Sequence, residues 1–198
     1  LMSETSSIAL VTGGNRGIGL AIAQALKGAG HRVVITYRSG TPPEGFDAVQ
    51  MDVTDSQSVD AGFTKIESEI GQPEIIVANA GITKDTLVMR MSDEDFESVI
   101  NANLTGAFRV SKRATKGLLK LKRGRLIFIG SVVGGVGAAG DGAGVAGEDD
   151  LVGRQALFLH QVLVDQAFTG GDQADVTAQF AQVDAAARAI AEGRFKSQ

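Results

Sequence analysis

A glycine-rich turn near the start of the chain limits the folds that the sequence can adopt. The turn covers residues 12–19 (TGGNRGIG), follows the apolar run at 8–11 and precedes a helix-like stretch at 20–26. Glycines let the backbone turn sharply between a strand and a helix and approach a ligand closely. The free N–H groups and the dipole of the new helix attract negative charge. The pattern therefore predicts a pyrophosphate-binding turn in a dinucleotide-binding fold.

Apolar strands alternate with helical patterns over the first two thirds of the chain. Strands are predicted at residues 8–11, 33–37, 46–51, 74–78 and 125–129. Apolar residues at helical spacing predict helices at residues 18–29, 55–70 and, as one long helix, from Asp93 to about Leu118. Nearly all-apolar strands that alternate with helices indicate the α/β class, as a Rossmann-type doubly wound parallel sheet. We expect the apolar stripe from Phe96 to Leu118 to lie in the core.

The character of the sequence changes after residue 133. Residues 134–147 are almost entirely glycine, alanine and valine, a composition that cannot pack as a regular element. We expect a single domain over residues 1–198, with a Gly/Ala-rich loop at 134–150 and an atypical C-terminal segment at 151–198.

The composition excludes several classes of function. A net charge of −4 gives no basic field for nucleic acid. The absence of cysteine excludes disulfides and zinc–thiolate sites, and no other pattern indicates a metal site. No apolar run approaches the roughly 20 residues of a membrane span, and no basic and apolar leader is present. We expect a cytoplasmic protein that binds neither nucleic acid nor a membrane.

Polar motifs follow the predicted strands in the order and spacing of a known family. The motifs are Thr12-Gly-x-x-x-Gly17-x-Gly19, Asp52-Val53, Asn79-Ala80-Gly81, Asn101-Ala102-Asn103-Leu104-Thr105-Gly106 and Ile129-Gly130-Ser131. They resemble those of the short-chain dehydrogenase/reductase family. Within that family the sequence is most similar to 3-oxoacyl-[acyl-carrier-protein] reductases of the mycobacterial type. The resemblance covers residues from about 7 to about 133.

The resemblance implies a dinucleotide site built from these motifs. The residues that it assigns to the phosphates are Gly13, Asn15, Arg16, Gly17, Ile18 and Gly19. The residues that it assigns to the adenine and the ribose side are Asp52 and Val53, and Asn79, Ala80 and Gly81.

The end of the second predicted strand indicates which dinucleotide is bound. An acidic residue there binds the 2′-hydroxyl of NAD, whereas arginine accommodates the 2′-phosphate of NADP. The sequence reads Tyr37-Arg38, with no acid until Glu44. We expect NADP(H), with Arg16 as a second phosphate partner.

The resemblance also implies catalytic residues. In this family hydride moves between nicotinamide and a carbonyl, while a tyrosine assisted by a lysine four residues on supplies the proton. A serine and an asparagine complete the group, and Ser131 and Asn103 match them. The positions of the tyrosine and the lysine fall on Gly144 and Glu148, and Tyr37 is the only tyrosine of the chain.

Two functions follow from these observations. The first is NADPH-dependent reduction of 3-oxoacyl thioesters, carried by acyl carrier protein or CoA, to 3-hydroxyacyl thioesters in fatty acid synthesis. The second is a catalytically impaired dinucleotide-binding or interaction protein of the same fold, without the Tyr-x-x-x-Lys pair.

The residues after Ser131 bear on both alternative functions. The stretch after Ser131 is shorter than in family members, so we expect this part of the fold to be truncated or atypical. A reading-frame change after residue 133 would also produce the abrupt shift in composition. In the family, a helix comparable to the Phe96–Leu118 stripe pairs subunits, which implies a homo-oligomer, either a dimer or a tetramer.

Overall fold

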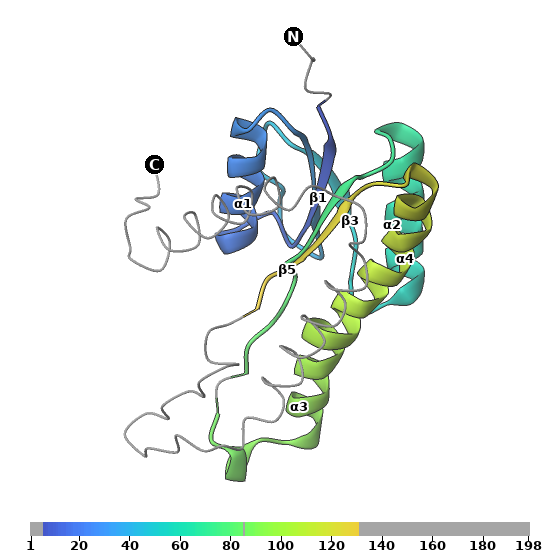
Figure 1. The fold of residues 1–198 in the computed structure, drawn as a ribbon. Helices are drawn as coiled ribbons and strands as arrows, with labels where there is room; N and C mark the ends of the chain where they lie inside the picture. The colour runs from blue at the N-terminus through green and yellow to red at the C-terminus, as the bar shows by residue number, and fades with distance from the viewer. Residues whose placement is uncertain (1–5, 85, 131–198) are drawn as a thin grey trace.

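The computed structural model describes residues 6–84 and 86–130, which form a parallel sheet with helices on both faces (Figure 1). The strands are β1 (Ile8–Thr12), β2 (Arg32–Tyr37), β3 (Asp47–Gln50), β4 (Ile75–Ala78) and β5 (Arg125–Phe128). Their order in the sheet is β3-β2-β1-β4-β5, with every neighbouring pair parallel. The predicted Rossmann-type α/β fold is confirmed for these residues. The predicted Gly/Ala-rich loop and C-terminal segment lie outside them.

The strand order reverses at β1, which lies between β2 and β4. Val11 is paired with Ile35 of β2 on one side and with Val77 of β4 on the other. The carboxyl ends of these strands therefore meet at one edge of the sheet. In open α/β sheets, ligands bind outside the carboxyl ends of the strands where the order reverses, so this edge is where a site is expected.

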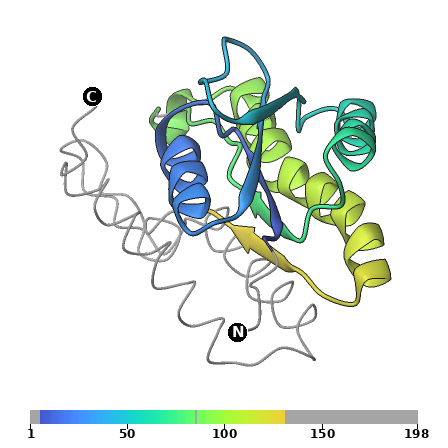
Figure 2. The same cartoon turned by 90° about the horizontal axis from the view of Figure 1, so that it is seen from above.

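Helices cover the two faces of the sheet. Helix α1 (Gly17–Gly28) lies on one face, whereas α2 (Ser56–Glu69) and α4 (Gly106–Leu121) lie on the other (Figures 1 and 2). Alternate residues of β1 pack on opposite faces of the sheet, because successive side chains of a strand point in opposite directions. Val11 packs in the cluster of α1, and Leu10 packs in the cluster of α2 and α4.

The helical stretch between β4 and β5 is divided. A short 3-10 helix, η1 (Val88–Arg90), precedes α3 (Asp93–Val99), which Ser92 caps by accepting a hydrogen bond from the Asp95 N–H. A π-helix, η2 (Ile100–Thr105), then leads into α4. The sequence predicted one continuous helix here. Hydrophobic spacing cannot reveal a local widening of this kind, and π-helical segments are frequent at functional sites.

The predicted core stripe from Phe96 to Leu118 is wrong for two of its residues. Phe96 is 44% exposed and Phe108 is 48% exposed. The buried residues of α4 are mostly small ones: Gly106, Val110, Ser111, Ala114 and Gly117. Because these residues follow helical spacing, α4 approaches its neighbours along this face and leaves Phe108 on another.

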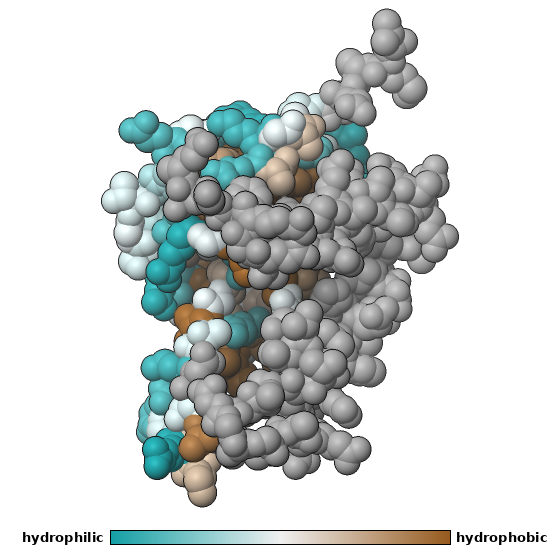
Figure 3. Space-filling view, turned by 90° about the vertical axis from the view of Figure 1, so that its left-hand side faces the viewer, coloured by the Kyte–Doolittle hydropathy of each residue, from teal (hydrophilic) through white to brown (hydrophobic). Residues whose placement is uncertain are grey.

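Hydrophobic side chains are also exposed elsewhere on the described surface. In Figure 3, hydrophobic residues are visible in the middle and lower part of the face on the α1 side, next to hydrophilic residues on the left of the view. The large hydrophobic side chains with the highest exposure are those of Met89 and Leu119, at 86% and 72%. None of the helices among the described residues combines the length and hydrophobicity needed to cross a bilayer.

Candidate functional site

The glycine turn joins β1 to α1 through backbone conformations and contacts that require glycine. Gly13 and Gly17 have positive φ angles of 64° and 55°, a region that favours glycine. A Cβ on Gly19 would collide with the side-chain amide of Asn79 and with the carbonyl of Gly13. These three glycines let the start of α1 lie directly against the ends of β1 and β4.

The N-terminus of α1 is open to a ligand. Its N-cap residue, Arg16, has an extended backbone and makes no side-chain capping bond. Arg16, Gly17 and Ile18 are all exposed. An uncapped helix start presents N–H groups and a positive dipole end, which together attract an anion. Asn15 lies beside this turn and donates to the Ser39 carbonyl, 3.4 Å away, in the loop that follows β2.

Thr12 and the Asn79-Ala80-Gly81 motif lock the ends of β1 and β4 together. The buried hydroxyl of Thr12 accepts hydrogen bonds from the N–H groups of Asn79 and Ala80, both at 3.0 Å, and donates to the Val77 carbonyl at 3.2 Å. The side-chain nitrogen of Asn79, Nδ2, donates to the carbonyls of Thr12 and Gly13. The Asn79 side chain therefore holds the shape of the glycine turn.

Asp52 begins a loop between β3 and α2, residues 52–55, called here the Asp52 loop. Oδ1 of Asp52 accepts bonds from the hydroxyl and the N–H of Thr54, at 2.7 and 2.8 Å. Burial acts to raise the pKa of Asp52, but these bonds and the positive charges of Arg38 and Arg109 outweigh it and lower the pKa below its ordinary value. Asp52 is thus held as a carboxylate, with the exposed Arg38 nearby.

Val53 belongs to the hydrophobic core. Its side chain is 8% exposed and packs against Gly106, where a Cβ would come within 2.9 Å of Val53 Cγ2. Val53 therefore anchors the Asp52 loop to the hydrophobic core.

Asn103 lies in the π-helix and holds the chain after β4. Its Oδ1 accepts from the Ile82 N–H at 2.8 Å, and its Nδ2 donates to the Ile82 carbonyl at 2.9 Å. A Cβ on Gly81 would lie 3.0 Å from Asn103 Oδ1. The two family motifs at residues 79–81 and 101–106 are therefore in contact. Ser131, Gly144 and Glu148 lie outside the described residues.

Two polar residues that bond to the site, Thr54 and Arg109, were not predicted from the sequence. Thr54 holds Asp52, and the spacing Asp-x-Thr, in which a side-chain oxygen bonds the backbone two residues on, was a signal for this turn. Arg109 binds the Asp52 loop and the π-helix, and no sequence signal indicates that role.

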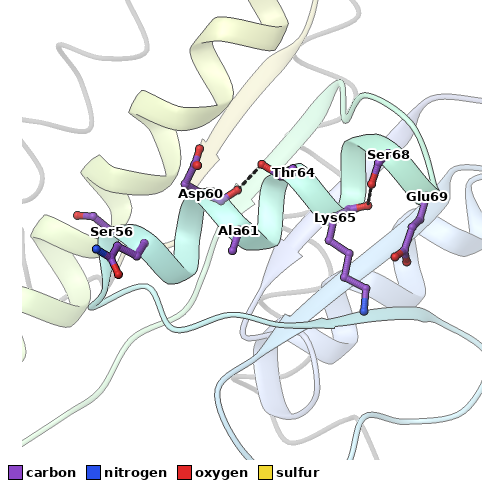
Figure 4. A pocket seen from close by; sticks show the side chains of 8 residues that line it. Ser56, Asp60, Ala61, Thr64, Lys65, Ser68 and Glu69 are labelled. Atoms are coloured by element: carbon purple, nitrogen blue, oxygen red, sulfur yellow. Dashed lines mark hydrogen bonds between the residues drawn. The ribbon is translucent and has the colours of Figure 1, made fainter.

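Two surface depressions are also present among the described residues. One runs along α2, where the hydroxyls of Thr64 and Ser68 donate to carbonyls of their own helix (Figure 4). Its described lining belongs to one helix, so no groups converge on a ligand. The other lies at the amino end of β2 and β3, where Lys27 donates to the Gly45 carbonyl and Arg32 pairs with Asp47. In this second depression Arg32 and Asp47 neutralise each other, and Lys27 is bonded to a backbone carbonyl.

The residues at the carboxyl edge fit a dinucleotide. The backbone at Gly17 is open, with no atom from elsewhere in the described residues within 4 Å of where a Cβ would lie, and the start of α1 favours an anion. The exposed guanidinium groups of Arg16 and Arg38 are suited to phosphate, and the Asp52 loop is ordered by its own hydrogen bonds.

Comparison with known proteins agrees with this geometry. A family model described as "short chain dehydrogenase" matches residues 7–143. This chain belongs to the short-chain dehydrogenase family. The family resemblance read from the motifs is confirmed, and the matched segment contains the whole described sheet.

Named relatives in this family are reductases. The chain is 51% identical over 153 residues to the 3-oxoacyl-[acyl-carrier-protein] reductase MabA of Mycobacterium tuberculosis (strain H37Rv). That alignment covers 77% of the chain and 62% of MabA. The chain is 39% identical over 169 residues to the 3-oxoacyl-[acyl-carrier-protein] reductase FabG of Escherichia coli (strain K12), covering 81% of the chain and 69% of FabG.

A solved structure has the same fold. The structure titled "Crystal structure of gox2181" is 33% identical, with a TM-score of 0.62, over 66% of this chain and 55% of that one. The chain thus spans about 62% of the length of the MabA of Mycobacterium tuberculosis and 55% of this structure.

Proposed function

We propose that the chain is an NADPH-dependent reductase of 3-oxoacyl thioesters in fatty acid synthesis. The observation that carries the proposal is the convergence of three motifs at one edge of the sheet: the glycine turn, the Asp52 loop and the Asn79-Ala80-Gly81 motif with Asn103. The names of the MabA and FabG relatives support the substrate class, a 3-oxoacyl group on acyl carrier protein, and CoA is an alternative carrier.

Different residues at the carboxyl edge of the sheet bind different parts of NADP(H). The first N–H groups of α1 and Asn15 bind the phosphates, and the Asp52 loop contacts the adenine. Arg38 and Arg16 neutralise the 2′-phosphate, since arginine binds phosphate through several parallel N–H groups. Bound NADPH supplies the hydride.

The proton for the substrate oxygen must come from the protein or from water. Asn103 holds the Ile82 backbone beside Gly81, which fits the place of the family's asparagine, and Ser131 is the candidate to orient the substrate carbonyl. No tyrosine or lysine stands at residues 144 and 148. Tyr37 ends β2, whereas β4 and the chain that Asn103 holds lie on the other side of β1.

This deficit supports a second candidate function. A chain that keeps the dinucleotide-binding edge and lacks the family's proton donor is a catalytically impaired dinucleotide-binding or interaction protein. The experiment that separates the two candidates is NADPH oxidation with acetoacetyl-CoA. Turnover at the rate of a FabG control would rule out the second candidate and require another acid. NADPH binding without turnover would rule out the first.

The assembly and the location belong to the same proposal. We propose a single-domain protein that forms a homo-oligomer, either a dimer or a tetramer, in the cytoplasm. Exposed Phe108 and Leu119 on α4 provide apolar surface for a subunit contact. Light scattering of the full chain tests this, and a monomeric mass at micromolar concentration would refute it.

A further inference from the structure

One guanidinium group, that of Arg109 on α4, bonds to both ends of the candidate site. Its Nε donates to Ser56 Oγ at 3.1 Å, and its Nη1 donates to the Val53 carbonyl at 3.2 Å. The same Nη1 donates to Asn101 Oδ1 at 2.8 Å and to the Asn101 carbonyl at 3.4 Å. Val53 lies in the Asp52 loop and Ser56 follows it, whereas Asn101 lies in the π-helix that carries Asn103. Arg109 therefore bridges the two segments.

Packing reinforces this bridge. Gly106 follows the π-helix directly and leaves no room for a Cβ beside Val53. Closely packed groups transmit displacements instead of absorbing them. The positive charge of Arg109 also contributes to lowering the pKa of Asp52, so the loop and the arginine are linked electrostatically as well. A movement of the Asp52 loop is thus passed to the start of the π-helix.

The π-helix in turn sets the position of Asn103. Asn101 and Asn103 are two residues apart in this short segment, whose hydrogen-bond geometry differs from that of an α-helix. Asn103 makes both of its side-chain bonds to Ile82, so a shift at Asn101 alters the chain after β4.

We propose that Arg109 is a positioning residue, which couples the Asp52 loop to Asn103 so that filling the adenine end of the site orders the π-helix. The identity of the ligand rests on the proposed function. The bridge itself is present without a ligand.

A matched pair of variants tests the coupling. Arg109→Gln removes the bridging guanidinium. Arg113→Gln removes a guanidinium one turn later on α4, which bonds Asp60 and Glu67 of α2 at 2.7 to 2.8 Å. Asn101→Ala weakens the same bridge and keeps the arginine, because it removes the Oδ1 acceptor and leaves only the bond to the Asn101 carbonyl. Hydrogen exchange is measured in the full chain over residues 52–57 and 100–104, with and without NADPH.

We expect NADPH to slow exchange in both segments of the unmodified chain and of Arg113→Gln. In Arg109→Gln, NADPH protects residues 52–57 but no longer 100–104, and in Asn101→Ala the protection of residues 100–104 is reduced. Without ligand, Arg109→Gln exchanges about tenfold faster in both segments, because local opening then breaks fewer charge-assisted bonds. Arg113→Gln leaves both rates unchanged.

Two results would overturn the coupling: retained NADPH protection of residues 100–104 in Arg109→Gln, or its equal loss in Arg113→Gln. Absence of NADPH protection in the unmodified chain would instead refute the proposed function. The hydrogen-exchange rates without NADPH would then test whether Arg109 links the two segments. Faster exchange in only one segment of Arg109→Gln would contradict that link.

Discussion

Asn79 donates two hydrogen bonds to Thr12, which lies 67 residues earlier in the sequence. The Asn79 N–H donates to Thr12 Oγ1 at 3.0 Å, and Asn79 Nδ2 donates to the Thr12 carbonyl at 2.9 Å. Thr12 is 1% exposed, so these bonds are shielded from water. The end of β1 and the chain after β4 are therefore held as one unit where the strand order reverses.

Replacing the Thr12 hydroxyl should destabilise the fold. Thr12→Val keeps the shape but leaves the N–H groups of Asn79 and Ala80 without their acceptor. We expect a loss of about 2 kcal/mol or more in the free energy of unfolding, measured by urea denaturation, since an unsatisfied buried donor costs roughly 1 to 3 kcal/mol.

Thr36→Val is the matched control. Thr36 is paired with Thr12 in the sheet and is equally buried, yet its hydroxyl has no hydrogen-bond partner within the described part of the chain. The control should be neutral or stabilising. Equal effects of the two variants would show that the Thr12 bonds do not matter.

A methyl group on Gly19 should close the site. In Gly19→Ala the new Cβ meets the Asn79 amide and the Gly13 carbonyl, so α1 must move away from the turn. We expect NADPH affinity to fall at least about tenfold, because the backbone can no longer approach the pyrophosphate. Gly28→Ala, at the far end of α1, has no atom within 4 Å of the new Cβ and should bind normally. Unaltered binding by Gly19→Ala would disprove the role of the turn.

Reversing the charge at Arg38 should change cofactor preference. Arg38→Asp removes the proposed 2′-phosphate partner, and a charge-assisted bond contributes roughly 1.5 to 3 kcal/mol. NADPH binding should therefore weaken by about 2 kcal/mol or more, with NADH binding unchanged or improved, as measured by fluorescence titration. Lys65→Asp makes the same charge change at an exposed position on α2 and should leave both affinities as they are. An unchanged NADPH affinity in Arg38→Asp would defeat the assignment.

Asp52 should make stability depend on pH in the acid range. Its folded-state pKa lies below the ordinary value of 3.8, so folding favours the carboxylate. This stabilisation is complete above pH 3.8 and is lost as the pH falls through the lower folded-state pKa. Asp52→Asn should be less stable than the unmodified chain at neutral pH, and the difference should shrink under acid. Urea denaturation at several pH values measures it. A difference that is independent of pH would contradict this account, and Glu44→Gln in an exposed loop is the control.

The sheet was predictable because its signals are local. Runs such as residues 33–37 are mostly apolar and are bounded by glycine or polar residues, which predicts strands buried on both faces. The glycine turn likewise predicted where β1 ends and α1 begins, and α1 ends at Gly28, one residue before the end of the helix predicted at residues 18–29.

The contacts of the site were not predictable in the same way. Nothing in the sequence shows that the Asn79 amide turns toward Thr12, because that bond depends on the pairing of β1 with β4. The π-helix and the exposure of Phe96 and Phe108 also depend on packing, since periodicity does not say which of two apolar stripes faces the core. The roles of Asn103 and Arg109 follow from that packing.

The most direct test of the central claim is a fluorescence titration of the full chain with NADPH and, separately, with NADH. The account predicts saturable binding of NADPH that is at least about tenfold tighter than that of NADH, because Arg38 and Arg16 favour a phosphate where no acid serves a ribose hydroxyl. Absence of saturable NADPH binding, or equal affinity for the two dinucleotides, would contradict it.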